Sequence, residues 1–177
     1  MRRQRRSPRL KDYDYTQLGA YFVTICTHQR QQLFGRVADD GMMILSDEGR
    51  VADNYWHSIP DHFPAVELDA FVVMPNHVHG ILMFNGGHGG AVSLHDDLGG
   101  TNSESFGKPV EGSLSTLIRS YKSIVTRTIR EMSATEIIVW QGRFHDHIIR
   151  SESSLNYIRQ YVMNNPALWR EDRFYVS

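Results

Sequence analysis

One apolar run near the middle of the chain organises the expected fold, Val72-Val73-Met74-Pro75-Asn76-His77-Val78-His79-Gly80-Ile81-Leu82. Its β-branched and aliphatic composition is typical of strands, and Pro75-Asn76 predicts a tight connection between two of them. In a strand, residues i and i+2 point to the same face. His77 and His79 therefore project together, while Val78 points to the other face, toward the core. Two neighbouring imidazoles on a stiff element can hold a divalent ion, although an isolated His-x-His also arises by chance on a solvated sheet face.

Patterns on both sides of this run predict an α+β domain. The expected strands are 19–27, 33–37, 42–45, 66–74, 77–84, 137–140 and 143–149, of which the last two are either separate strands or one bent strand. The expected helices are 46–59, which Pro60 ends, 114–132 and 155–164. The order strand, helix, strand, strand, helix, strand indicates a ferredoxin-like (RRM-like) sandwich. We expect an antiparallel sheet with helices on one face, followed by a C-terminal helix.

The composition is that of a soluble globular domain, with 177 residues, 41% hydrophobic and 22% charged. No apolar run approaches the roughly 20 residues that span a bilayer. The single cysteine, Cys26, excludes an internal disulfide and fits a reducing cytoplasm. We expect a basic arm at residues 1–12 and one domain at 13–177, interrupted by a glycine-rich loop at 85–112. That loop has no phosphate-cradling G-x-x-x-x-G-K motif, so nucleotide hydrolysis of that kind is unsupported.

The near-neutral net charge of −1 conceals an asymmetry along the chain. The first 11 residues contain no acid and hold six of the 19 basic residues, Arg2, Arg3, Arg5, Arg6, Arg9 and Lys11. The other 166 residues therefore carry 13 basic against 20 acidic residues, a net charge of −7. A cationic arm on an acidic body favours contact with a nucleic-acid backbone, but a solubilising tail has the same composition.

The last predicted helix carries a second set of polar residues. Tyr161 and Asn165 are i and i+4, so they lie on one helical face, and Tyr157 lies one turn earlier. If this face packs over the histidine strand, a phenol and an amide oxygen meet the two imidazoles. From the residues alone, helical aromatics are usually core, and Tyr157 competes with Tyr161 for a chemical role.

Together these motifs resemble the single-tyrosine transposases of the HUH (histidine, hydrophobic, histidine) superfamily. The resemblance is most specific to REP-associated tyrosine transposases, which act on repetitive extragenic palindromes in bacterial genomes. It rests first on Met74-Pro75-Asn76-His77-Val78-His79 and on Tyr161-Val162-Met163-Asn164-Asn165-Pro166. The further matching segments are 7–11, 19–27, 112–115, 121–123, 139–141 and 147–150.

The resemblance implies a fold, a chemistry and a substrate. It implies that His77, His79 and Asn165 hold Mg²⁺ or Mn²⁺, whereas the ligands alone leave Zn²⁺ open. It implies that Tyr161, on the C-terminal helix, attacks single-stranded DNA to form a 5′-phosphotyrosine link. The expected substrate is hairpin-forming repeat DNA, bound by a cytoplasmic, nucleoid-associated monomer or homodimer. The expected DNA-binding residues are those of the basic arm, together with Arg119 and Lys122 on the positive outer surface of the helix at 114–132. For any single residue of that surface, a plain solvated helix face is the more common role.

Two other functions stay open at this stage. One is a non-catalytic repeat-DNA-binding protein that retains the fold, although such a protein would not require all four site residues. The other is a metal hydrolase of unrelated substrate, disfavoured by the basic arm and by the lack of a carboxylate near the His pair. His145 and His147 form a second His-x-His around Asp146, and we expect for them a structural or DNA-proximal role.

Overall fold

The computed structural model describes residues 19–85, 112–133 and 136–176. The expected basic arm and nearly all of the expected glycine-rich loop lie outside these residues. The described elements, in chain order, are β1 (Gly19–Cys26), η1 (His28–Arg30), β2 (Gly35–Val37), β3 (Met43–Leu45), α1 (Asp47–His57), α2 (Ile59–His62), β4 (Val66–Met74), β5 (His77–Phe84), α3 (Leu114–Ser133), β6 (His145–Ile149), α4 (Glu152–Asn164) and η2 (Trp169–Glu171).

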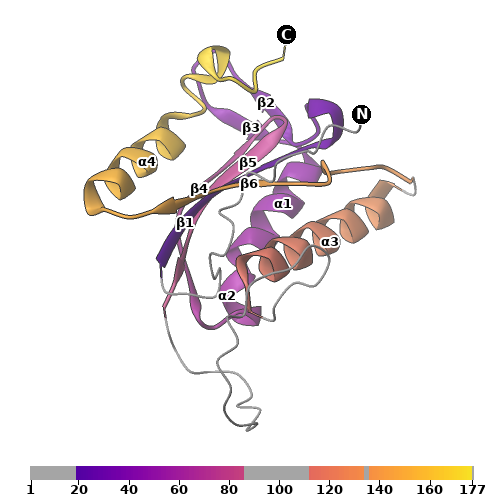
Figure 1. Ribbon diagram of the computed structural model, residues 1–177. Helices are drawn as coiled ribbons and strands as arrows, with labels where there is room; N and C mark the ends of the chain where they lie inside the picture. Colours follow the sequence, from indigo (N-terminus) through magenta and orange to yellow (C-terminus); the bar gives the residue numbers. More distant parts are fainter. Residues whose placement is uncertain (1–18, 86–111, 134–135, 177) are drawn as a thin grey trace, which may run out of the picture.

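The main sheet has four antiparallel strands in the order β4-β5-β1-β6 (Figure 1). This order is that of a ferredoxin-like sandwich, which confirms the predicted α+β class. The hairpin β2–β3 forms a separate two-stranded sheet between β1 and α1. Among the described helices, none combines the length and the apolar character that crossing a membrane requires.

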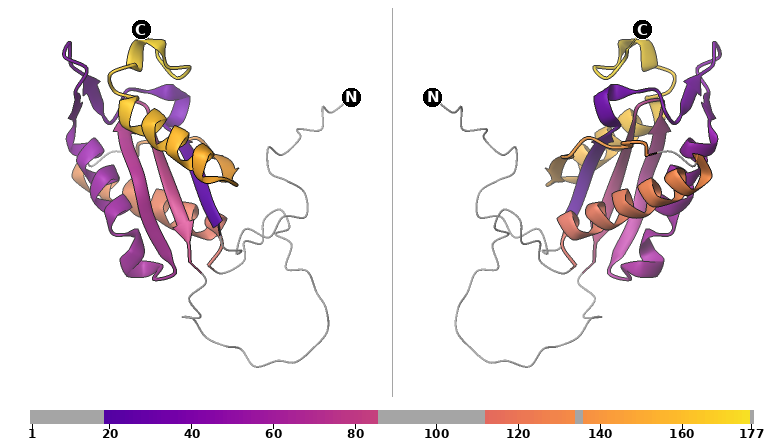
Figure 2. Two further views of the ribbon diagram at one scale, coloured as in Figure 1. Left: turned by 90° about the vertical axis from the view of Figure 1, so that its left-hand side faces the viewer. Right: turned by 90° about the vertical axis from the view of Figure 1, so that its right-hand side faces the viewer.

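Helices cover both faces of the sheet. In Figure 2, α3 lies over one face in the right-hand view, and α4 lies over the opposite face in the left-hand view. The two-residue periodicity of β5 explains how each face is packed. Val78 and Leu82 belong to the large core beneath α1 and α3, whereas Ile81 packs with α4. The predicted C-terminal helix is thus present, and it covers the face onto which the histidines project.

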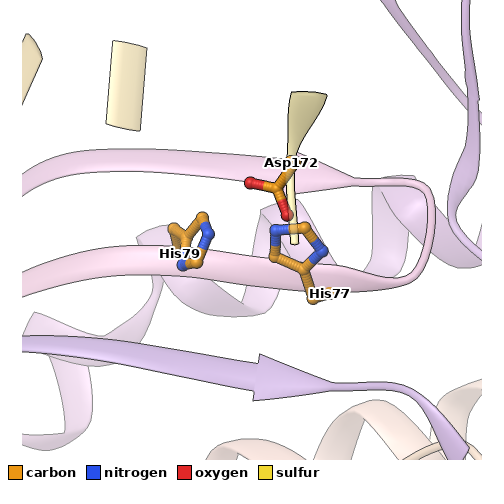
Figure 3. A group of neighbouring side chains, drawn as sticks. All are labelled: His77, His79 and Asp172. Atoms are coloured by element: carbon orange, nitrogen blue, oxygen red, sulfur yellow. The ribbon is translucent and has the colours of Figure 1, made fainter. Parts of the chain in front are cut away.

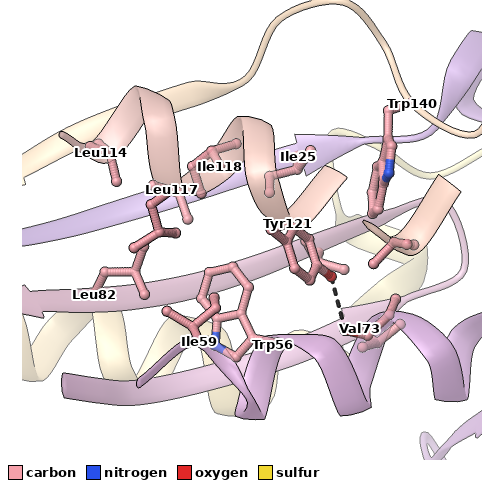
Figure 4. Close-up of a cluster of buried hydrophobic side chains, with 14 of the residues drawn as sticks. Ile25, Trp56, Ile59, Val73, Leu82, Leu114, Leu117, Ile118, Tyr121 and Trp140 are labelled. Carbon is pink, nitrogen blue, oxygen red and sulfur yellow. Dashed lines mark hydrogen bonds between the residues drawn. The ribbon is translucent and has the colours of Figure 1, made fainter. Parts of the chain in front are cut away.

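The large core is built from the apolar face of α3 against the sheet and α1 (Figure 4). The buried residues of α3 recur at helical spacing along one face, namely Leu114, Leu117, Ile118, Tyr121, Val125 and Ile129. Trp56 of α1 stacks on Phe71 of β4 with ring centroids 4.5 Å apart. Its ring also lies directly against Gly80 of β5, where a side chain would collide with it.

Two local predictions differ from the structure. Pro60 does not end the first long helix: α1 ends at His57, and Pro60 lies in the first turn of the short helix α2. A first-turn proline costs little because its missing N–H has no helical partner there. The predicted strand at 137–140 is wrong as well. Within the described residues of that stretch, only Trp140 pairs with a strand-end residue, in an isolated bridge to Thr27.

Candidate metal and tyrosine site

His77 and His79 project together from β5, as the strand periodicity predicts (Figure 3). Tyr161 of α4 packs against the His79 ring on this face. Both side chains are fully buried, and their ring centroids lie 4.4 Å apart. The antiparallel pairing with β1 places Cys26 opposite His77 and Thr24 opposite His79. Two imidazoles are therefore held side by side on a central strand of the sheet.

The Nδ1 atom of each imidazole has a hydrogen-bond partner. The Asn76 Oδ1 lies 2.8 Å from the His77 Nδ1, and the Thr24 Oγ1 lies 2.8 Å from the His79 Nδ1. The Asn76 Nδ2 donates to the Phe174 carbonyl at 2.8 Å, so this amide turns its oxygen toward His77. His77 consequently donates from Nδ1, and its Nε2 lone pair is free for a ligand.

The helix α4 begins after Ser151, whose side chain accepts from the Ser154 backbone N–H, and it lays one face over the His pair. The Tyr161 hydroxyl lies 3.3 Å from the His79 Nε2. Asn165 follows at the C-cap of the helix and is buried. Tyr157, the competing phenol, points to solvent with 73% of its surface exposed. Of the two tyrosines, only Tyr161 therefore reaches the imidazoles.

Asp172 is a member of the site that the sequence analysis missed. Its Oδ2 accepts from the Tyr161 hydroxyl at 3.1 Å and from the Asn165 Nδ2 at 2.8 Å. One ligand atom each from His77, His79 and Asp172 lie within 4.8 Å of one another (Figure 3). The sequence argument against a hydrolase, that no carboxylate accompanies the His pair, is therefore wrong. Asp172 follows the short turn η2, and no periodic spacing connects it to the histidines.

The residues of the site fit a divalent cation. Two buried atoms of the described chain have no hydrogen-bond partner at this site, the His77 Nε2 and the Asn165 Oδ1. A buried polar atom without a partner is costly, and a metal ion would satisfy both of these atoms. With the His79 Nε2 and the Asp172 carboxylate nearby, the available donors are two imidazole nitrogens and up to two oxygens. Such a set suits Mn²⁺, Mg²⁺ or Zn²⁺, and the donors alone do not choose among them.

The electrostatics of the site keep both imidazoles neutral. Burial lowers the pKa of His77 to about 3, assisted by the positive charges of Arg173 and Arg30. Burial also lowers the pKa of His79 well below its usual value, and His77 contributes in the same direction. Neutral imidazole is the form that binds a metal, so at neutral pH no proton has to leave either ring.

The pKa of the Tyr161 phenol is shifted in the opposite direction. Burial and, after it, the negative charge of Asp172 together raise the pKa of Tyr161 to about 12. Without a bound cation, the Tyr161 phenol is therefore protonated at neutral pH. Nucleophilic attack by its oxygen requires a proton acceptor or a nearby cation. Asp172 already accepts a hydrogen bond from this hydroxyl.

The other predicted residues that the structure describes belong to α3 and β6. Arg119 is exposed on α3, across the sheet. Lys122, also on α3, is partly buried and donates to the Gln141 and Gly142 carbonyls at 2.6 and 3.4 Å. His145 and His147 lie exposed on the edge strand β6, and the cross-strand pairing of His145 with Thr24 places it on the same face as His79. The arm residues fall outside the described part of the chain.

Comparison with known proteins finds a sequence relative and a solved structure with a similar fold. No protein-family model matches the chain. An uncharacterized protein of Haemophilus influenzae is 40% identical over 174 residues, which cover 98% of this chain and 94% of that protein. The solved structure of a REP-associated tyrosine transposase bound to a REP hairpin aligns with a TM-score of 0.54 at 19% identity, covering 94% of this chain and 73% of the other. The chain therefore belongs to one family with the Haemophilus influenzae protein, and its fold is that of the REP-associated tyrosine transposase.

Proposed function

We propose that this protein is a metal-dependent single-stranded DNA nicking and joining enzyme, a transposase of the REP-associated tyrosine type. The observation that carries the proposal is the Tyr161 hydroxyl, 3.3 Å from the His79 Nε2 and 3.1 Å from the Asp172 Oδ2. Beside it lie the two unpartnered ligand atoms of His77 and Asn165. A nucleophile, a proton acceptor and a cation-binding set thus meet under one helix.

His77 and His79 would hold the metal, with the Asn165 Oδ1 and the Asp172 carboxylate as oxygen ligands. A bound Mg²⁺ or Mn²⁺ supplies Lewis-acid polarisation of the scissile phosphate and offsets the negative charge that develops there. The protein's own contribution is geometric. Asn76 and Thr24 fix the imidazole orientations, and the turn after α4 brings Asn165 and Asp172 to the same place.

In the proposed reaction the Tyr161 oxygen attacks the phosphorus of a phosphodiester. The phenol proton passes to Asp172, the bond between phosphorus and the 3′ oxygen breaks, and that oxygen takes up a proton to become a 3′-hydroxyl. The new bond is a 5′-phosphotyrosine link, which conserves the energy of the broken ester. Attack by a 3′-hydroxyl on this link reverses the step and joins two strands.

The proposed substrate is single-stranded DNA that folds into a hairpin. The aligned transposase structure contains a REP hairpin, and hairpin DNA is the substrate class that we propose for this chain. The cationic arm at residues 1–12 would contribute backbone contacts. A cytoplasmic location beside chromosomal DNA, and action as a monomer or homodimer, belong to the same proposal.

The experiment is an adduct assay with end-labelled hairpin DNA, Mn²⁺ and a denaturing gel. The wild-type protein is expected to form a covalent DNA–protein adduct, and Tyr161→Phe is expected to abolish it. Tyr157→Phe is the matched control because it removes an exposed hydroxyl one turn away, and its adduct should equal that of the wild type. An adduct that survives in Tyr161→Phe would refute the assigned nucleophile.

A metal hydrolase is the second candidate, because Asp172 places a carboxylate beside the His pair. A carboxylate there can activate water as well as a phenol. Cleavage that leaves no adduct and persists in Tyr161→Phe would favour the hydrolase. A shift on a native gel with neither cleavage nor adduct would instead identify a non-catalytic repeat-binding protein.

A further inference from the structure

Two arginines that take no part in the proposed chemistry stand beside the His pair. Arg30 closes η1, the turn that follows β1, and Arg173 comes directly after Asp172. The two residues are far apart in sequence, yet the Arg30 Nη1 donates to the Arg173 carbonyl at 3.2 Å. Both side chains are exposed. They form a pair of positive groups on the solvent side of a buried site.

The ring of Phe174 connects these guanidinium groups to the imidazoles. The Arg173 guanidinium carbon lies 4.5 Å from the centroid of this ring, and that of Arg30 lies 5.3 Å from it. The same ring lies 4.7 Å from the His77 ring, centroid to centroid. The Phe174 ring therefore separates each guanidinium group from His77, a candidate metal ligand.

The position of both arginines is built into the fold. The Asn76 Nδ2 donates to the Phe174 carbonyl at 2.8 Å and more weakly to the Arg30 carbonyl at 3.4 Å, while its oxygen holds His77. Gln29 and Arg30 have φ angles of 52° and 58°, in the left-handed region that non-glycine residues rarely adopt. Consecutive residues of this kind persist only where surrounding structure imposes them, and such strain clusters at functional sites.

In the part of the chain that the structure describes, Arg30 and Arg173 take part in no ion pair. Arg170, in the same C-terminal segment, lies instead 4.0 Å from an Asp39 carboxylate oxygen. Two guanidinium groups with no ion-pair partner among the described residues, next to a candidate cation site, have the charge and the donor geometry that suit phosphate oxygens.

We propose that Arg30 and Arg173 form a phosphodiester-binding subsite that grips the DNA backbone beside the bond attacked by Tyr161. This inference rests on the proposed function and adds its substrate contact. The planar guanidinium forks would each donate to one phosphate, so that the backbone lies across Phe174. The alternative is purely structural, in which the two arginines only hold Phe174 over His77 through cation–π contacts.

The test measures hairpin binding without cleavage, in the Tyr161→Phe background with Mn²⁺ present, as salt is varied. Replacing one phosphate contact should make the slope of log affinity against log salt shallower by about 0.7, the value for single strands. Arg30→Gln and Arg173→Gln should each show this change, with affinity reduced by about tenfold, and the double variant about twice the slope change. Arg170→Gln is the matched control and should leave slope and affinity unchanged.

Two further measurements separate the subsite from a structural role. Calorimetric titration with Mn²⁺ should show undiminished metal affinity in both variants, because neither guanidinium touches a ligand atom. Arg173→Lys keeps a charge but loses the fork, so it should retain the salt slope and recover only part of the affinity. Loss of Mn²⁺ binding in the Gln variants, or an unchanged salt slope, overturns the subsite.

The outcomes for the two proposals are distinguishable. If the wild-type protein forms the covalent adduct while the Gln variants keep the full salt slope, the subsite is refuted and the proposed enzymatic function is retained. If the wild-type protein binds hairpin DNA with the predicted Arg-dependent slope but never forms an adduct, the proposed enzymatic function is refuted and the phosphate-binding role of the two arginines is retained.

Discussion

The contact between Thr24 and His79 shows how a single residue can determine which nitrogen of an imidazole is available to a metal ion. Thr24 is buried on β1, and its hydroxyl is the partner of the His79 Nδ1. A partner on one ring nitrogen fixes the tautomer and the orientation of the other nitrogen. The antiparallel register alone brings these two residues together.

We therefore predict that Thr24→Val lowers Mn²⁺ affinity by roughly 10- to 100-fold, the usual effect of removing such a partner. It should also lower the free energy of unfolding of the metal-free protein by about 1–3 kcal/mol, because a buried Nδ1 is left unpaired. Calorimetric titration and urea unfolding measure the two effects. Thr24→Ser keeps the hydroxyl and is the control, and equal Mn²⁺ affinity in the two variants would contradict the assigned role.

Gly80 illustrates a constraint on the opposite face of the same strand. An added Cβ would lie 2.1 Å from an atom of the Trp56 ring, and this ring is fully buried. The tryptophan cannot move easily because it stacks on Phe71 and meets Tyr121 edge-on. The glycine after the His pair is thus required by close packing of the core.

Gly80→Ala is expected to destabilise the protein by at least about 1–3 kcal/mol, the range for overpacked cores. The midpoint of urea unfolding measures the loss. At Gly142, the described chain places no heavy atom within 4 Å of an added Cβ, so Gly142→Ala is the control and should leave the midpoint nearly unchanged. Equal midpoints for the two variants would show that the Trp56 contact is unimportant.

Among the secondary-structure elements, α4 is the one whose placement decides the chemistry. It is held on the sheet by an apolar cluster that includes Ile81, Ile158 and Val162. It is also held by an ion pair in which the Arg159 Nε lies 2.8 and 3.1 Å from the two Asp69 carboxylate oxygens. Asp69 and Ala70 lie together at an irregularity in the β4–β5 pairing, between Leu68 and Phe71.

This ion pair predicts a pH dependence of stability. Hydrogen bonding to Arg159 lowers the pKa of Asp69 below its usual value of 3.8, so the folded state keeps the charge where the unfolded state takes up a proton. The stabilisation is present above pH 3.8 and is lost as the pH falls through the lower folded value. Asp69→Asn should remove this part of the acid-induced decrease in the free energy of unfolding.

Thermal unfolding measured between neutral pH and pH 3 checks this prediction. Glu67→Gln is the matched control because Glu67 is an exposed carboxylate on the same strand. If Asp69→Asn and the wild type lose stability in parallel on acidification, the ion pair does not hold α4 in the manner proposed.

Across the whole molecule, positive charge is concentrated at one end of the sequence. The candidate site is built within a body of net negative charge, while six basic residues precede residue 12. A polyanionic substrate would be drawn by the arm and then held at the site by Arg30 and Arg173. We therefore expect the arm and the site to supply separable parts of the proposed affinity for DNA.

Deletion of residues 2–11 is expected to weaken hairpin binding and to flatten its salt dependence, since six cations are removed. Fluorescence anisotropy with labelled hairpin DNA over a salt titration measures both changes. Replacing Arg36, an exposed residue of β2 in the folded domain, by Gln is the control and should have little effect. An affinity that does not change across the titration would contradict a DNA-contacting arm.

The sequence by itself determined the features that depend on local periodicity. The period of two in β5 placed His77 and His79 on one face, and the helical period placed Tyr161 one turn from Asn165. These relations hold whatever the rest of the chain does, because backbone geometry imposes them. The antiparallel α+β class also followed from the order of such elements.

Only the tertiary structure decided what meets the two imidazoles. Asp172 and Thr24 reach the imidazoles, and Arg30 and Arg173 reach the Phe174 ring beside them. They do so through cross-strand register and irregular turns, for which no spacing in the chain gives a signal. It also decided that Tyr161 faces the site while Tyr157 faces solvent, because the packing of α4 selects one helical face. Contacts between distant segments depend on how the whole chain packs, and local patterns carry no record of them.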